Sequence, residues 1–172
     1  MRRELFQPTV EGEARLLLLI DAFSTGTSAL EGRTKLAKLD FFLRYPRFLQ
    51  RALEIREPNH RIVVPLDEST NIENRMVRYR FGPWDPAYFA LLGRLIGKQL
   101  IQTISTPKGL SYKVTELGHA TAEKLASDES WAETASIIKL LKRHLDLQGS
   151  TLKDFIYTNF PEVSEARWGN QL

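Results

Sequence analysis

Residues 85–127 read DPAYFALLGRLIGKQLIQTISTPKGLSYKVTELGHATAEKLAS, and this stretch decides the fold class of the chain. Its first two residues, Asp85 and Pro86, are typical of a helix start, because an N-cap acceptor is followed by proline at the first helical position. Apolar side chains then recur up to Gly97, at Tyr88, Phe89, Leu91, Leu92, Leu95 and Ile96. The pattern predicts a helix over about residues 86–97.

The residues after this helix predict a β-hairpin and a second helix. Two short β-rich runs, Leu100 to Thr106 and Leu110 to Thr115, flank the turn sequence Pro-Lys-Gly at 107–109. Thr115 can cap a helix through about residue 126. On that helix we expect the inward positions to be Leu117, Ala120 and Leu125. Helix, hairpin, helix is the order found in the second half of a winged helix-turn-helix domain.

Two helices and a short third are predicted upstream. The first covers residues 11–23, with core positions at Leu16, Leu17, Leu19 and Ile20. The second runs from Arg33 to Pro46 and presents Leu36, Leu39, Phe42 and Leu43 at helical spacing. Its basic residues fall on or near the opposite side, where we expect solvent: Lys35, Lys38 and Arg44. Pro46 ends this helix and begins the next, because proline is tolerated at the first helical position.

The remaining segments predict an insertion and a helical C-terminal part. Between residues 57 and 85 the helical pattern stops, and Arg61–Val64 and Met76–Phe81 predict strands separated by the polar stretch 67–73. Downstream, Ser130 with Glu133 predicts a capping box that opens a helix to His144. Gly149 ends that unit, and Ser150 can cap a last helix over 152–160.

The whole chain is therefore predicted to be α+β and mostly α. A winged helix-turn-helix domain would cover residues 1–127, with a β-rich insertion at about 57–85, and a C-terminal helical extension would cover residues 128–172.

Composition excludes several classes of site. The 172 residues include no cysteine, which rules out disulfides, thiolate metal sites and a cysteine nucleophile. The three histidines lie in different predicted elements, so we expect no metal and no cofactor. The sequence from Gly93 to Lys98 is not a phosphate-binding loop, because its glycine spacing is wrong and it lies within a helix. Without a paired acid and base, we expect no enzymatic activity and no small-molecule substrate.

The longest apolar run, Leu16 to Ile20, is too short to span a membrane, so we expect a cytoplasmic protein without membrane contact. The formal net charge is only +3, but basic residues are in excess over residues 31–51 and 73–113. In winged domains a helix and the hairpin tip carry cations toward phosphates. The candidate nucleic-acid contacts are Arg78, Arg80, Arg94, Lys98, Lys108 and Lys113. A solvated, purely solubilising role is the alternative for each of them.

The pattern around residues 78–89 indicates which side chains could reach a nucleic acid. Arg78 and Arg80 alternate with apolar neighbours on a predicted strand, so we expect them to project away from the core. Trp84, Tyr88 and Phe89 could stack on bases, but their spacing favours a place in the core.

One longer stretch resembles a known family. Residues 32–46, GRTKLAKLDFFLRYP, together with YKVTELG at 112–118, resemble the middle component of bacterial ABC-three-component systems, a group that includes the small subunit of Lamassu anti-phage systems. The resemblance implies a non-catalytic adaptor that bridges an SMC- or Rad50-like ATPase to an effector nuclease. Candidate docking residues are Lys35, Lys38, Ile137, Leu141, Leu145, Phe155 and Phe160. For the apolar ones, burial in the protein's own core is the alternative.

The resemblance therefore implies an adaptor in anti-phage or anti-plasmid defence, and the basic residues predict double-stranded DNA as a second contact. The competing hypothesis is a free-standing winged-helix transcription regulator that binds DNA.

Overall fold

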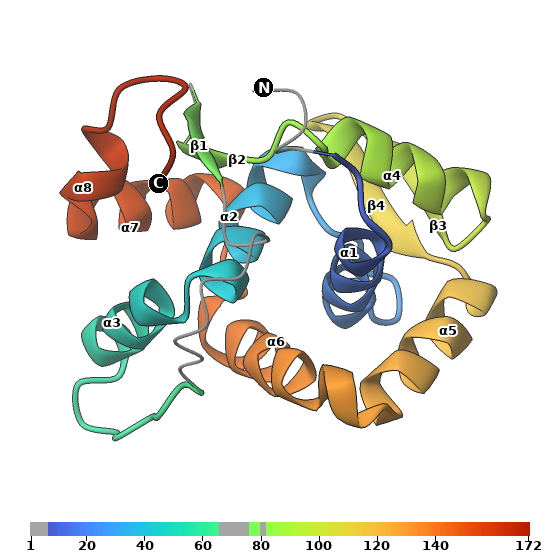
Figure 1. The fold of residues 1–172 in the computed structure, drawn as a ribbon, viewed down its shortest axis with the longest axis horizontal. Coiled ribbons are helices and arrows are strands. Elements are labelled where there is room, and N and C mark those ends of the chain that lie inside the picture. Colours follow the sequence, from blue (N-terminus) through green and yellow to red (C-terminus); the bar gives the residue numbers. More distant parts are fainter. Residues whose placement is uncertain (1–6, 66–75, 80–81) are drawn as a thin grey trace.

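The computed structural model describes residues 7–65, 76–79 and 82–172. The protein is mostly helical and carries two small antiparallel sheets (Figure 1). Its elements are α1 Val10–Phe23, α2 Gly32–Arg44, α3 Pro46–Arg56, β1 Val77–Tyr79, β2 Gly82–Trp84, α4 Tyr88–Gly97, β3 Ile101–Thr106, β4 Gly109–Val114, α5 Glu116–Ser127, the 3₁₀ turn Glu129–Trp131, α6 Ala132–Leu145, α7 Gly149–Asn159 and α8 Pro161–Ser164. The coarse prediction of a mostly α, α+β chain is confirmed.

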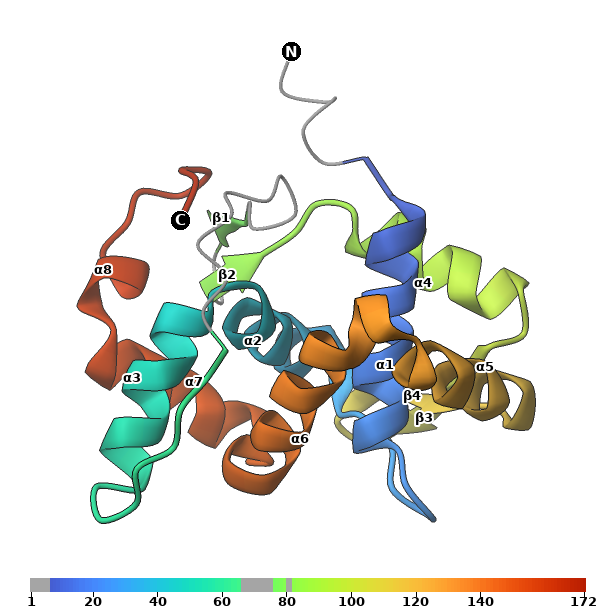
Figure 2. The same ribbon diagram turned by 60° about the horizontal axis from the view of Figure 1, so that its bottom comes forward.

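Helix α2 runs through the middle of the molecule. Figures 1 and 2 show α1 on one side of it, α3 and α7 on the other, and α6 crossing nearby. Leu16 of α1, Leu36 of α2, Leu141 of α6 and Ile156 of α7 are all fully buried and belong to one apolar cluster. The core is therefore continuous across residue 127, and the C-terminal helices complete it.

The hairpin of β3 and β4 gains a partner from the segment before α2. Tyr112 and Leu30 exchange two backbone hydrogen bonds of 2.8 and 2.9 Å, so Leu30 pairs antiparallel with β4. Thr115 caps α5 as predicted, its hydroxyl accepting from the Gly118 amide at 3.0 Å. A Cβ at Gly118 would lie 1.8 Å from the Leu100 carbonyl oxygen, so only glycine lets α5 approach the hairpin this closely.

This close approach corrects the predicted face of α5. Gly118 and Ala122 are its buried positions, whereas Leu117 and Ala120 are exposed and Leu125 is half-buried. The apolar spacing alone pointed to the leucines. The backbone contact at Gly118 decides the rotation of the helix instead.

Several local predictions between the helices were wrong. Residues 61–64 form no strand; β1 pairs antiparallel with β2 instead. The polar stretch 67–73 lies outside the described residues. Ser130 does not cap α6, because Asp128 accepts from the Ser130 amide at 2.8 Å and forms the 3₁₀ turn first. Gly149 begins α7 rather than ending the preceding unit, so Ser150 lies inside that helix.

The charged side of α2 is buried, which is the largest departure from expectation. Asp40 accepts from Arg15 Nε of α1 at 2.8 Å and from the Tyr88 hydroxyl of α4 at 2.7 Å. Arg44 pairs with Asp85, three residues before the start of α4, at 2.7 Å. Burial by itself would raise the pKa of Asp40, but the charges of Arg15 and Arg44 hold it below its usual value. This polar cluster joins α1, α2 and the start of α4.

Candidate functional site

The outward side of α4 is an apolar stripe. Helix α4 begins at Tyr88, and Asp85 is not its N-cap as predicted, because Asp85 Oδ1 accepts from the Ala87 amide at 2.8 Å in the turn before the helix. The inward side chains of α4 are buried. With a turn every 3.6 residues, the exposed positions fall on one side of the helix. Besides the charged Arg94 they are Phe89, Ala90, Gly93, Ile96 and Gly97, and we call these five apolar positions the α4 stripe.

The α4 stripe combines two large side chains with two glycines between and beside them. Phe89 is 62% exposed and Ile96 is 41% exposed. No atom lies within 4 Å of the position that a Cβ would take at Gly93 or Gly97. The guanidinium carbon of Arg33 lies 4.4 Å from the centre of the Phe89 ring and holds it from the α2 side. From Phe89 to Ile96 the stripe is about 10 Å long.

The basic residues beside the α4 stripe are already paired. Glu13 of α1 is buried, and its carboxylate binds Arg94 at 3.3 Å and also Lys98. Arg94 donates in addition to the backbone oxygen of Pro8 at 3.1 Å. These two candidates for nucleic-acid contact therefore serve to neutralise a buried carboxylate and to attach α4 to α1.

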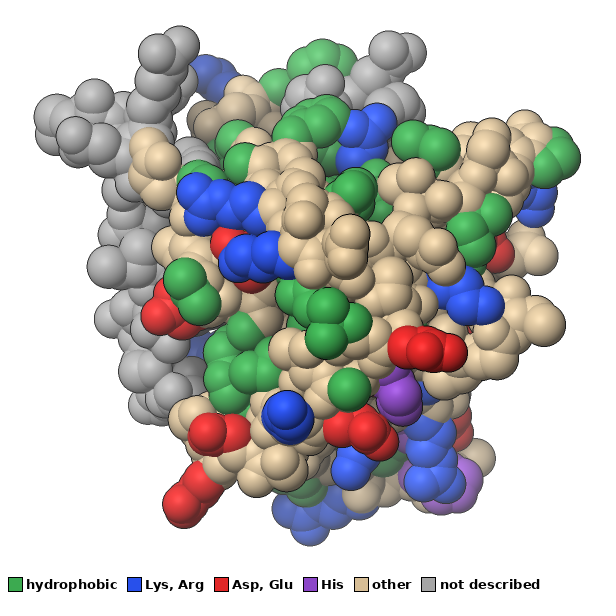
Figure 3. Space-filling view, turned by 90° about the vertical axis from the view of Figure 1, so that its right-hand side faces the viewer, with side chains coloured by type: hydrophobic (Ala, Val, Ile, Leu, Met, Phe, Trp, Pro, Cys, Tyr) green, Lys and Arg blue, Asp and Glu red, His purple; other side chains and the backbone are tan. Residues whose placement is uncertain are grey.

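Of the other nucleic-acid candidates, the three that the structure describes are not brought together. Arg78 is buried and donates to the Ser164 carbonyl at 3.2 Å, which contradicts the expectation that it projects from the core. Arg80 lies outside the described residues. Lys113 donates to the Gly26 carbonyl at 2.6 Å. Lys108 is exposed at the hairpin tip. In Figure 3, which views the molecule from the right-hand side of Figure 1, Lys and Arg side chains are scattered among acidic, apolar and uncharged ones.

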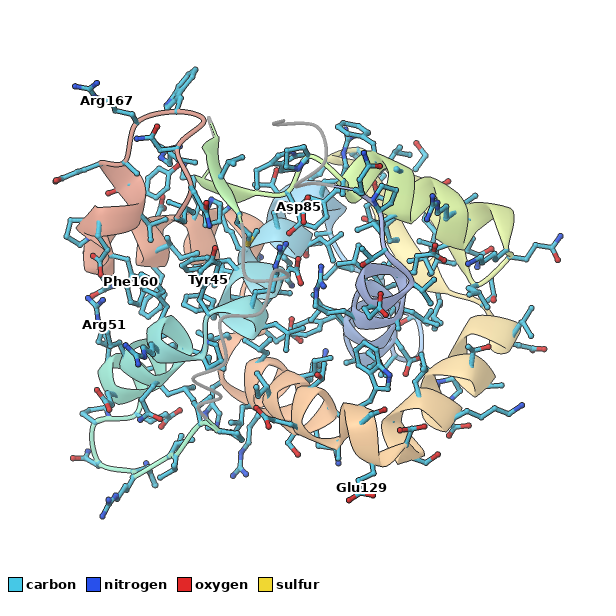
Figure 4. All side chains as sticks on the ribbon, viewed as in Figure 1. Tyr45, Arg51, Asp85, Glu129, Phe160 and Arg167 are labelled. Atoms are coloured by element: carbon cyan, nitrogen blue, oxygen red, sulfur yellow. The ribbon has the colours of Figure 1, made fainter. Side chains whose placement is uncertain are left out.

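The predicted docking residues are occupied within the chain. Ile137, Leu141 and Leu145 are buried in the core that α6 forms with α1 and α2, so they offer no surface to a partner. Phe160 is fully buried, with Phe155 half-buried beside it. Figure 4 places Phe160 beside Arg51 of α3, whose guanidinium carbon lies 5.0 Å from the ring centre. The alternative of internal packing is the correct one for these residues.

The two candidate lysines of α2 are also buried. Lys35 pairs with Asp146 at 3.0 Å, and Lys38 donates to the Thr34 carbonyl of its own helix at 3.2 Å. They lie inward because α2 has neighbours on nearly every side. The prediction that Lys35 and Lys38 lie on an exposed face was therefore wrong.

The histidines come closer together than the sequence indicated. His144 Nδ1 lies 3.1 Å from Glu57, and His60 Nδ1 lies 3.6 Å from the same carboxylate. Over residues 7–65, 76–79 and 82–172, no group of three or more His, Asp or Glu side chains has a geometry that could hold a metal ion. Across the same ranges, every helix is too short or too polar to cross a bilayer.

The α4 stripe was not predicted as a site. The sequence of α4 is apolar on both sides, so its periodicity could not tell Phe89 and Ile96 from the core residues Leu91 and Leu95. In the sequence, only Gly93 and Gly97 indicate which side of α4 is left uncovered by the rest of the protein.

No protein family, curated protein or solved structure matches this chain.

Proposed function

We propose that this protein is a non-catalytic adaptor that docks a helix of a partner protein on the α4 stripe. The proposal depends on one observation: Phe89 and Ile96 are exposed on either side of Gly93, whose outer surface is open. Glycines let a second backbone approach closely, and a flanking aromatic and aliphatic side chain supply the apolar area that helix recognition requires.

A winged helix-turn-helix assignment fits this use of α4. The assignment is supported by the order of the elements along the chain: α1, then Leu30, which pairs with β4, then α2, α4 and the β3–β4 hairpin. Helix α3 and the β1–β2 pair would be an insertion between α2 and α4. In that order α4 is the helix that would face a groove of DNA. Its exposed side is mostly apolar, Arg94 and Lys98 are paired with Glu13, and Arg33 lies over the Phe89 ring, so this helix favours protein over phosphate.

The partner we propose is the SMC- or Rad50-like ATPase of a cytoplasmic anti-phage or anti-plasmid complex, with an effector nuclease as the further subunit. The support for this choice is the resemblance of residues 32–46 and 112–118 to ABC-three-component middle components. A coiled-coil ATPase also presents long helices, which is the shape that the α4 stripe would accept.

Co-expression with the genes that flank its own gene tests the proposal. We expect a subunit with Walker motifs and a coiled coil to co-purify with the wild type. The double variant Phe89→Ser, Ile96→Ser should bind it about 100-fold more weakly, since each anchor lost costs on the order of 1–2 kcal/mol. Val63→Ser removes another exposed apolar side chain, 70% exposed, and should bind normally.

Two results would contradict the adaptor proposal. One is elution of the wild type alone when it is co-expressed with such an ATPase. The other is an unchanged affinity of the double variant for the partner.

A free-standing DNA-binding regulator is the second candidate, favoured by the exposed Lys108 at the hairpin tip. It predicts that Lys108→Glu weakens binding to duplex DNA and lowers the salt dependence of the binding constant. Fluorescence anisotropy with labelled duplex at low salt measures both. Absence of binding at low salt would remove this candidate.

A further inference from the structure

A groove of about 630 Å³ lies where the hairpin tip meets the first turns of α2 and α7. It shares no residue with the α4 stripe, so it is independent of the proposed docking function. Three lysines from three different elements line it: Lys35 of α2, Lys108 of the hairpin tip and Lys153 of α7. One carboxylate, that of Glu31, lines it as well.

Two helices begin at this groove without a side-chain cap. Helix α2 has 13 residues and starts after Glu31, and α7 has 11 residues and starts after Gln148; neither of these N-cap side chains accepts a hydrogen bond from its helix. The first backbone amides of a helix have no partner within the helix and carry a partial positive charge. The Gly32 amide already donates to the Leu30 carbonyl at 2.9 Å, so the donors at this cavity are the later amides of the first turn of α2 and the first amides of α7, an arrangement suited to an anion.

Ser111 of β4 provides an independent sign of a missing ligand. It lines the groove and is only 5% exposed. Within the described part of the chain, its hydroxyl makes no hydrogen bond. The hydroxyl faces the open groove, so it is free to donate a hydrogen bond to a polar ligand there.

A buried lysine adds uncompensated positive charge beside the groove. Lys38 is 1% exposed, and its ammonium donates to the carbonyl of Thr34, which lines the groove. No carboxylate in the described ranges pairs with it, in contrast to Lys35, which has Asp146. Burial, and to a smaller extent the nearby charge of Lys153, lower the pKa of Lys38 to about 8.

We propose that this groove binds a phosphate group. Its oxygens would accept from amides in the first turns of α2 and α7 and from the Ser111 hydroxyl, while Lys108 and Lys153, whose ammonium also lies 3.6 Å from Asp154, supply the opposite charge. The volume is that of a nucleotide-sized ligand. The phosphate could belong to a free phosphorylated molecule or to the end of a DNA strand, which present the same chemical group.

The test uses the purified full chain and inorganic phosphate. Sodium phosphate should raise the midpoint of thermal unfolding above that in sodium chloride of equal ionic strength, and calorimetry should detect saturable binding. Lys153→Gln and Lys108→Gln should each weaken that binding about tenfold. Lys139→Gln removes an exposed lysine of α6 away from the groove and should bind like the wild type.

Ser111→Ala separates a specific site from general attraction to positive charge. The variant keeps all the lysines, so it should weaken phosphate binding without changing the response to chloride. Competition against inorganic phosphate by ATP, and by a duplex with or without a 5′-phosphate, identifies the source of the group. The proposal is overturned if phosphate and chloride give the same midpoint, or if Lys153→Gln and Lys139→Gln bind phosphate equally.

Discussion

Helix α2 buries four charged side chains, whereas helix α4 leaves an apolar stripe in contact with solvent. Both helices have the apolar spacing of an amphipathic helix, so sequence periodicity treats them alike. Their surroundings differ. Helix α2 packs against α1, α3, α6, α7 and both hairpins, whereas α4 packs mainly against α1 and β3. Position in the molecule, rather than polarity, decides which side of each helix is covered.

The difference also separates stability from binding. On α2, charged groups are held by partners such as Arg15 and Asp85, so substitutions there should affect folding. On α4, the outward residues contribute little to the core, so substitutions there should affect recognition. Three variants test this division.

Asp40→Asn should have the largest effect on stability. The change leaves the shape of the side chain but removes the buried negative charge that faces Arg15 and Arg44. We expect a loss of about 3–5 kcal/mol in the free energy of unfolding, measured by urea denaturation at pH 7. Because the pKa of Asp40 is lowered in the folded state, the wild type should lose this contribution only as the pH falls through that lowered pKa.

The matched control for Asp40→Asn is Asp154→Asn. Asp154 lies on α7 with its side chain 73% exposed, so the same chemical change there should alter the free energy of unfolding by less than about 0.5 kcal/mol. Equal effects of the two variants would mean that the buried cluster does not stabilise the fold.

Lys38→Met should have an intermediate effect of opposite sign. Removing a buried ammonium while keeping a long apolar chain should stabilise the fold by about 2 kcal/mol at pH 7. The pKa of Lys38 is about 8 when folded and near 10.5 when unfolded. The unfolded chain therefore binds more protons between these values, and wild-type stability should rise with pH across that window.

Denaturation of both proteins between pH 6.5 and 9.5 checks the Lys38 prediction. The advantage of Lys38→Met should be greatest below pH 8 and should shrink above it. A constant difference across the range would show that the effect comes from packing and not from the buried charge.

Gly93→Ala should have the smallest effect and should raise stability. The site is open in the α4 stripe, so alanine meets no atom within 4 Å and gains about 0.5–1 kcal/mol from helix propensity. Thermal unfolding measures the gain. The same change at Gly118, where a Cβ would overlap the Leu100 carbonyl, should destabilise the protein, and a gain at both sites would contradict the structure.

The structure changes the role of two cations beside α4. The sequence predicts Arg94 and Lys98 as nucleic-acid contacts. Since both neutralise the buried Glu13, reversing their charge would leave that carboxylate facing two acids and would destabilise α1 against α4. Lys108 is the better position for testing DNA contact, because its side chain is exposed at the tip.

Local signals located most elements. The proline at position 46, the cap at Thr115 and the turn at 107–109 were read correctly because each acts through its own backbone neighbours. Local signals did not locate the helix starts near Ser130 and Ser150. Asp128 accepts the Ser130 amide and begins a 3₁₀ turn before α6, and α7 starts at Gly149, one residue before Ser150. Both outcomes were as compatible with the sequence as the predicted caps.

The sequence by itself determined the helices, the hairpin and the order in which they follow one another, because caps, turns and apolar periodicity act over a few residues. Only the tertiary structure decided which sides of those helices are covered. Lys35 and Lys38 are buried because α2 is central, and Phe89 and Ile96 are exposed because nothing in the described chain packs over α4. The groove at the hairpin tip arises in the same way, since its lysines and helix starts are far apart in sequence and meet only in the fold.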